Sequence, residues 1–146
     1  MSKDYDPRMH STEHILNQTM VRMFNRGRSF SNHIEKKKSK CDYYFDRDLM
    51  PEEISKIESR VNSEIKKNHN VSEEYLPREK AEKEYFLGRL PTDAGEEIRI
   101  IKIGDYDACP CSGIHVQNTS EISEFKIIST GYDNGVLRIR FKLSGD

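Results

Sequence analysis

The pattern of apolar residues along the chain predicts three helices, and the first covers residues 7–24. Asp6 followed by Pro7 is a typical N-cap and first-turn pair. Gly27 follows shortly after the last apolar position, as glycine often does at helix ends. Residues 1–6 are polar, and we expect them to be flexible. The apolar face repeats every three or four positions and consists of Met9, Leu16, Met20, Met23 and Phe24.

A second helix is expected over residues 51–68, beginning with Pro51 and ending in a basic turn with Lys66. Acidic residues after the proline and basic residues at the end agree with the helix dipole. A shorter third helix is expected over residues 77–85, ended by Gly88. The apolar face of the second helix consists of Ile54, Ile57, Val61 and Ile65.

Alternation of apolar and polar residues predicts strands in the remaining segments. The segment Tyr132–Gly135 (Y-D-N-G) is a hairpin turn signal. Residues 25–40 are basic, and we expect a partly mobile connection there. The chain therefore predicts a single domain of residues 1–146 with an α+β fold, in which two long helices pack on one face of an antiparallel sheet. The predicted strands are 41–45, 71–76, 98–103, 125–129 and 136–143.

Composition limits the classes of function. Hydrophobic and charged residues each make up 34% of the chain, and the net charge is −1, so no overall positive field indicates DNA binding. No apolar run approaches the roughly 20 residues of a membrane span. The start lacks the apolar segment of a secretory signal, so we expect a cytoplasmic protein. The chain has three cysteines, an odd number that suits metal ligation better than disulfides, and they are Cys41, Cys109 and Cys111.

Two pairs of metal-ligand residues stand far apart in the sequence. His10 and His14 are four positions apart in the first predicted helix, so both lie on one helix face. Cys111 and His115 have the same spacing in a glycine-containing turn. Imidazole and thiolate are ligands that Zn²⁺ accepts. The two pairs therefore predict one shared zinc site.

The segment from His10 to His14 also reads H-x-x-E-H, the inverted zincin pattern, in which Glu13 would be the general base of a metalloprotease. The chain is short for a peptidase, however, and no acidic third ligand stands on a later helix. Cys111 and His115 would also be left without a role. On the shared-site interpretation, Glu13 is a helix-surface carboxylate or orients a histidine.

Taken together, these motifs resemble the second additional domain of threonyl- and alanyl-tRNA synthetases, and most closely the small freestanding alanyl-tRNA editing proteins. The segment His10–His14 (H-S-T-E-H) is similar to the family's H-x-x-x-H, and Cys111–Val116 (C-S-G-I-H-V) to its C-x-G-T-H-V. Asn118–Ile122 is similar to N-T-G-E-I, and Gly135–Ile139 to G-V-R-R-I. The resemblance spans residues 8 to 142.

The resemblance implies hydrolysis of the ester bond in mischarged tRNA, typically Ser- or Gly-tRNA(Ala), acting in trans and without ATP to protect translation fidelity. Zinc could polarise the ester carbonyl or order the pocket. Four protein ligands would close a site that catalysis usually keeps open. Ser112 and Ile114 depart from the family pattern and leave an alternative, a non-catalytic, zinc-stabilised tRNA-binding protein. The implied zinc ligands are His10, His14, Cys111 and His115.

Candidate contacts to the substrate and to tRNA carry less specific signals. Four residues next to the ligands either contact the hydroxylated amino acid of the substrate or are ordinary helix and loop residues. They are Ser11, Thr12, Ile114 and Gln117. A set of basic residues has two interpretations: contacts to phosphates of the mischarged tRNA, or side chains in solvent. The set consists of Lys36, Lys37, Lys38, Arg138, Arg140 and Lys142. Cys109, expected on the same side as Cys111, is either a further ligand or a buried thiol.

Overall fold

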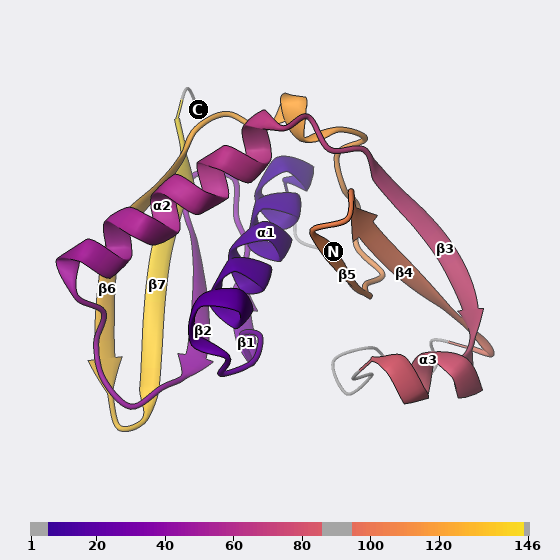
Figure 1. The fold of residues 1–146 in the computed structure, drawn as a ribbon, viewed down its shortest axis with the longest axis horizontal. Coiled ribbons are helices and arrows are strands. Elements are labelled where there is room, and N and C mark those ends of the chain that lie inside the picture. The colour runs from indigo at the N-terminus through magenta and orange to yellow at the C-terminus, as the bar shows by residue number, and fades with distance from the viewer. Residues whose placement is uncertain (1–5, 86–94, 145–146) are drawn as a thin grey trace.

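The computed structural model describes residues 6–85 and 95–144, and within them the chain forms two antiparallel sheets and three α-helices (Figure 1). The elements in chain order are α1 (Pro7–Phe24), β1 (Ser31–His33), β2 (Ser39–Tyr44), α2 (Pro51–Lys66), β3 (Val71–Pro77), α3 (Arg78–Glu84), β4 (Glu97–Ile103), β5 (Asp107–Pro110), the short 3-10 helix η1 (Thr119–Glu121), β6 (Phe125–Asp133) and β7 (Val136–Leu143).

The larger sheet has the strand order β1-β2-β7-β6, and α1 and α2 cover one of its faces (Figure 1). Buried and partly exposed residues alternate along β7, so one face of the sheet packs on the core and the other faces solvent. The predicted α+β fold, with antiparallel strands and two long helices on one face, is confirmed. The residues of β7 that face the helices are Leu137, Ile139, Phe141 and Leu143.

The smaller sheet has the strand order β3-β4-β5 and carries its own helix. Helix α3 packs through Ala81 on Ile98 and Ile100 of β4, and these three residues form a separate apolar cluster. The expected single sheet is therefore divided in two. The smaller sheet thus provides α3 with an apolar surface formed by Ile98 and Ile100.

Most element boundaries follow their local sequence signals. The Asp6 side chain accepts a hydrogen bond from the Arg8 backbone at the start of α1, and Asn25 ends the helix with a φ of 56°. Asp6 is therefore buried and ordered, unlike the flexible segment expected over residues 1–6. The β6–β7 turn has positive φ at Asn134 and Gly135 (48° and 84°), as the hairpin signal predicted.

The connection expected over residues 25–40 contains a strand that the sequence did not reveal. Strand β1 has three residues and pairs with β2 from Ser31 to His33. The expected helix end at Gly88 and the start of the flexible segment, residues 1–5, lie outside the described residues. None of the described helices combines the length and the apolar character that a membrane crossing requires.

Candidate metal centre

The two predicted pairs of ligands come together between the N-terminal half of α1 and the loop that follows β5. Ligand atoms of His10, His14, Cys111 and His115 all lie within 4.8 Å of one another. The Cys111 Sγ atom is 3.4 Å from His10 Nε2 and 3.4 Å from His115 Nε2. Residues that are about 100 positions apart thus form one compact cluster.

Hydrogen bonds on the outer side of the rings set the direction of two imidazoles. His10 Nδ1 donates to the Ile114 carbonyl over 3.3 Å, which directs Nε2 toward the cluster. His115 Nδ1 lies 3.0 Å from Ser11 Oγ, and this oxygen also accepts from the Val116 backbone over 3.2 Å. The His10 and His115 rings stack at 4.2 Å.

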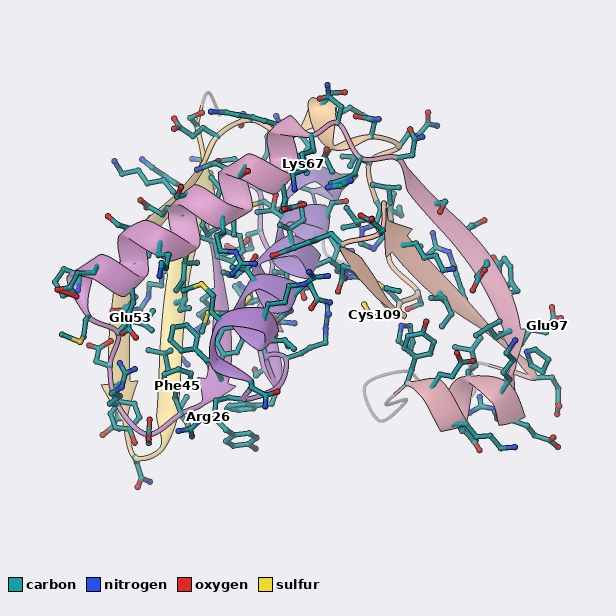
Figure 2. All side chains as sticks on the ribbon, viewed as in Figure 1. Arg26, Phe45, Glu53, Lys67, Glu97 and Cys109 are labelled. Carbon is teal, nitrogen blue, oxygen red and sulfur yellow. The ribbon has the colours of Figure 1, made fainter. Side chains whose placement is uncertain are left out.

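His14 is held from behind by a buried polar network. Its Nδ1 atom lies 3.5 Å from Asp107 Oδ2 and 3.2 Å from the Cys109 thiol, which leaves Nε2 for the cluster. Asp107 in turn accepts hydrogen bonds from Arg28 (2.6 and 3.3 Å) and from Gln18 (2.9 Å). Such a carboxylate behind a ligating histidine fixes its tautomer and orientation. Figure 2 places Cys109 on the side of β5 that faces α1.

The charges of this network reinforce one another. Burial alone would raise the pKa of Asp107, but the Arg28 guanidinium holds it well below its usual range. Burial works against a charged His14, yet the neighbouring Cys109 and Asp107 raise its pKa well above the ordinary value. His14 is therefore electrostatically tied to this carboxylate.

Two of the donors have strongly shifted pKa values. Burial alone would raise the pKa of the Cys111 thiol, but hydrogen bonds from His10, His115 and His14 lower it to about 3. Burial lowers the pKa of His115 to about 4, and the neighbouring histidines add to this effect. At neutral pH Cys111 is thus a thiolate and His115 is neutral, which are the forms that bind metal.

The loop that carries Cys111 is fixed from the smaller sheet. Arg99 on β4 donates through Nη1 to the carbonyls of Cys111 (3.1 Å) and Gly113 (2.7 Å). Its Nε atom pairs with Glu73 on β3 at 2.5 Å. The Gly113 backbone donates to Cys111 Sγ over 3.4 Å. Arg99 therefore connects the smaller sheet to the position of the thiolate.

This donor set fits a tetrahedral metal ion. Bond lengths of about 2.3 Å to sulfur and 2.0–2.1 Å to nitrogen place S and N ligand atoms about 3.6 Å apart around zinc. The two measured S···N distances are 3.4 Å. A second group, His14, Asp107 and Cys109, could also hold a metal ion, but it uses the opposite side of the His14 ring and is fully buried.

A cleft of about 940 Å³ opens beside the donors. Aromatic residues from three parts of the chain line it, with Phe30 before β1, Tyr44 at the end of β2 and Tyr85 after α3. Its volume lies near the upper end of the roughly 300–1,000 Å³ that is typical of small-molecule sites. Glu13 also lines the cleft and is 6% exposed, so the expected helix-surface carboxylate is wrong.

The structure does not bring the predicted substrate contacts into this cleft, as far as its described lining goes. Ser11 and Thr12 are fully buried, and Thr12 donates to the Arg8 carbonyl over 2.7 Å. Ile114 is 51% exposed, and its carbonyl accepts from His10. Gln117 is exposed. Ser11 instead supports His115, and a direct substrate role for these residues remains a prediction.

The predicted tRNA contacts lie on another part of the surface. Lys36, Lys37 and Lys38 are exposed in the β1–β2 connection. Arg138 and Arg140 lie on the face of the larger sheet that is opposite to the helices, where they border a shallow hollow rather than the cleft. Basic side chains therefore follow the outer face of this sheet.

The sequence did not reveal the polar residues that orient His14. Asp107 carries no motif of its own, and Arg28 lies in a segment that was expected to be a loop. A usable signal did exist, because Asp107, Cys109 and Cys111 alternate in one segment and so share one side of an extended chain. A strand there would have placed a carboxylate and two sulfur atoms together.

Comparison with known proteins supports the same relationship. A family model, the threonyl and alanyl tRNA synthetase second additional domain, matches residues 98–140. The chain is 32% identical over 134 residues to an alanine–tRNA ligase of Coxiella burnetii (strain Dugway 5J108-111), which covers 90% of this chain and 16% of that protein. The alanine–tRNA ligase of Methanosarcina mazei is 33% identical over 145 residues (92% and 15%), and that of Aeropyrum pernix 32% over 146 (95% and 16%).

The chain thus spans about a sixth of the length of these relatives, and the similarity extends over about nine-tenths of the chain itself. The resemblance that the two separated motifs indicated is confirmed. The chain is related to alanine–tRNA ligases, and part of it matches the second additional domain of threonyl and alanyl tRNA synthetases.

Proposed function

We propose that this chain hydrolyses the ester bond of mischarged aminoacyl-tRNA at a zinc site, with Ser- or Gly-tRNA(Ala) as the substrate. The observation that carries the proposal is the convergence of four donors, three of which line a cleft, in a chain related to alanine–tRNA ligases. The residues that would hold the zinc ion are His10, His14, Cys111 and His115.

When bound, zinc supplies Lewis acidity toward the ester carbonyl of the substrate. The protein's own residues do the positioning. Asp107 and Cys109 hold His14, while Ser11 holds His115, so the donors keep their directions when the substrate enters. The cleft is large enough for the aminoacyl group and the terminal nucleoside of a tRNA.

Phosphate contacts would come from exposed and partly exposed basic residues outside the cleft. The β1–β2 connection and the outer face of the larger sheet carry these residues, and phosphate contacts position a nucleic acid without reading its sequence. Binding through them weakens as salt rises. The proposed contacts are Lys36, Lys37, Lys38, Arg138 and Arg140.

The test is deacylation of Ser-, Gly- and Ala-tRNA(Ala) by the wild type, by His10→Ala and by Cys111→Ala, with zinc measured by elemental analysis. We expect turnover of Ser- or Gly-tRNA(Ala), and losses of about 100-fold or more in both variants because they remove metal donors. His33→Ala is the control, because His33 is an exposed histidine on β1 outside the cleft.

Absence of turnover by zinc-loaded wild-type protein, with tRNA still bound, would contradict hydrolysis. That outcome would favour the alternative of a non-catalytic, zinc-stabilised tRNA-binding protein. A full loss of activity in His33→Ala would indicate a general effect of histidine removal on folding.

A further inference from the structure

Glu13 is a buried carboxylate beside the donor cluster that the proposed reaction has not used. It lies on α1 between His10 and His14, is 6% exposed, and lines the cleft. A carboxylate removed from water is unfavourable unless hydrogen bonds or a cation stabilise its charge. The neighbours of Glu13 therefore decide what the cleft can bind.

One carboxylate oxygen has a fixed partner. Glu13 Oε2 accepts a short hydrogen bond from the side-chain amide of Asn17, one helical turn further along α1. Asn17 is 1% exposed, and its Oδ1 atom accepts from the Ser29 backbone over 2.8 Å. The second bond fixes the orientation of the amide, so its NH₂ group must face Glu13.

The other oxygen has no hydrogen bond to the described residues. Glu13 Oε1 lies 3.6 Å from His10 Nε2, which is beyond hydrogen-bond range. Asn17 and His10 thus leave Oε1 open to a donor that enters from the cleft.

The arginine that lines the cleft has another hydrogen-bond partner. The charges of Arg28 and Glu13 interact, but the two described hydrogen bonds of Arg28 are to Asp107. Glu13 also lies outside the group of donors whose atoms are all within 4.8 Å of one another, so it does not complete that metal site. A hydrogen-bond donor for Oε1 can therefore arrive with the substrate.

We propose that Glu13 binds the free α-ammonium group of the aminoacyl substrate and so makes the site selective for aminoacyl esters with an unblocked amine. An ammonium group beside the ester carbonyl is common to all aminoacyl-tRNAs, and a carboxylate close to the donors would orient the carbonyl toward them. This inference rests on the proposed function. Glu13 is a positioning residue, and it takes no part in bond breaking.

The test compares hydrolysis of Ser-tRNA(Ala) with that of N-acetyl-Ser-tRNA(Ala) by the wild type and by Glu13→Gln. We expect the wild type to prefer the free amine by about tenfold or more in kcat/KM, the scale of a charge-assisted hydrogen bond. Glu13→Gln should lose this preference through slower hydrolysis of Ser-tRNA(Ala), with an unchanged zinc content. Glu82→Gln is the matched control, an exposed carboxylate on α3 outside the described lining of the cleft.

Equal rates on the two substrates for the wild type would overturn the inference even if Glu13→Gln failed to fold. A preference that persists in folded Glu13→Gln would overturn it as well. Should neither substrate be hydrolysed, the proposed function fails, and binding of 3′-(L-serylamino)-3′-deoxyadenosine decides the inference separately. About tenfold tighter binding than its N-acetyl derivative, lost in Glu13→Gln, would support a role of Glu13; equal affinities would exclude it.

Discussion

On the outer face of the larger sheet, Asp42 of β2 and Arg138 of β7 form a two-pronged ion pair. Arg138 donates to the two carboxylate oxygens over 2.7 and 2.9 Å, and the strands place the two residues directly opposite each other. Hydrogen bonds from Arg138 hold the pKa of Asp42 below its ordinary value. A carboxylate with a lowered pKa stabilises the folded state only while it is ionised.

We expect Asp42→Asn to lower the free energy of unfolding by about 1 kcal/mol at neutral pH, since Arg138 keeps partial contact with water. Asp42 contributes fully above the unfolded-state pKa of about 3.9, and its contribution is lost as the pH falls below that value. Urea unfolding from pH 7 to pH 3 measures the effect. If the difference in unfolding free energy between wild type and variant grew toward low pH, ionised Asp42 would not be the stabilising form.

Single residues differ in how far the sequence predicts their roles. His10, His14, Cys111 and His115 were predictable because their chemistry is distinctive and their spacing matches the backbone. Asp107 was not, because carboxylates are common and only the fold shows which of them are buried. Ser11 was singled out for its hydroxyl, but the structure turns that hydroxyl toward His115.

Among the elements, strand β4 carries the residue that positions the metal-binding loop. We expect Arg99→Ala to weaken zinc binding by about tenfold or more, because the carbonyls of Cys111 and Gly113 lose their donor. Competition with a chelator measures the affinity. Lys102→Ala is the matched control, since Lys102 is also on β4 but its Nζ atom pairs with Glu74 at 3.2 Å. Equal losses in both variants would contradict a specific role of Arg99.

Helices and strands were predicted unequally well. The ends of α1 and the whole of β7 follow from local signals, namely a side-chain cap, a left-handed asparagine and strict alternation. Strands β1 and β5 have three and four residues, too few for a clear period, and their pairing partners are distant in the sequence. The division into two sheets depends on what α3 packs against, which local patterns do not contain.

In the whole molecule, the donor cluster connects α1 on the larger sheet to the loop that leaves the smaller sheet. A ligand that binds only the folded state stabilises it by about 4 kcal/mol at 1,000 times its Kd. We therefore expect chelation to lower the Tm of the wild type by several degrees. The Tm of Cys111→Ala should change little. Thermal unfolding with and without chelator measures this, and an unchanged wild-type Tm would contradict a metal that joins the two sheets.

The wide separation of the ligands also matters while the protein is being made. His10 leaves the ribosome 101 residues before Cys111, and translation adds about 5–20 residues per second. The histidines of α1 are therefore synthesised roughly 5 to 20 s before Cys111. Strand β2 also lacks its neighbour β7 until residue 143 has been added. The nascent chain is thus exposed to premature metal capture until the donor cluster is complete.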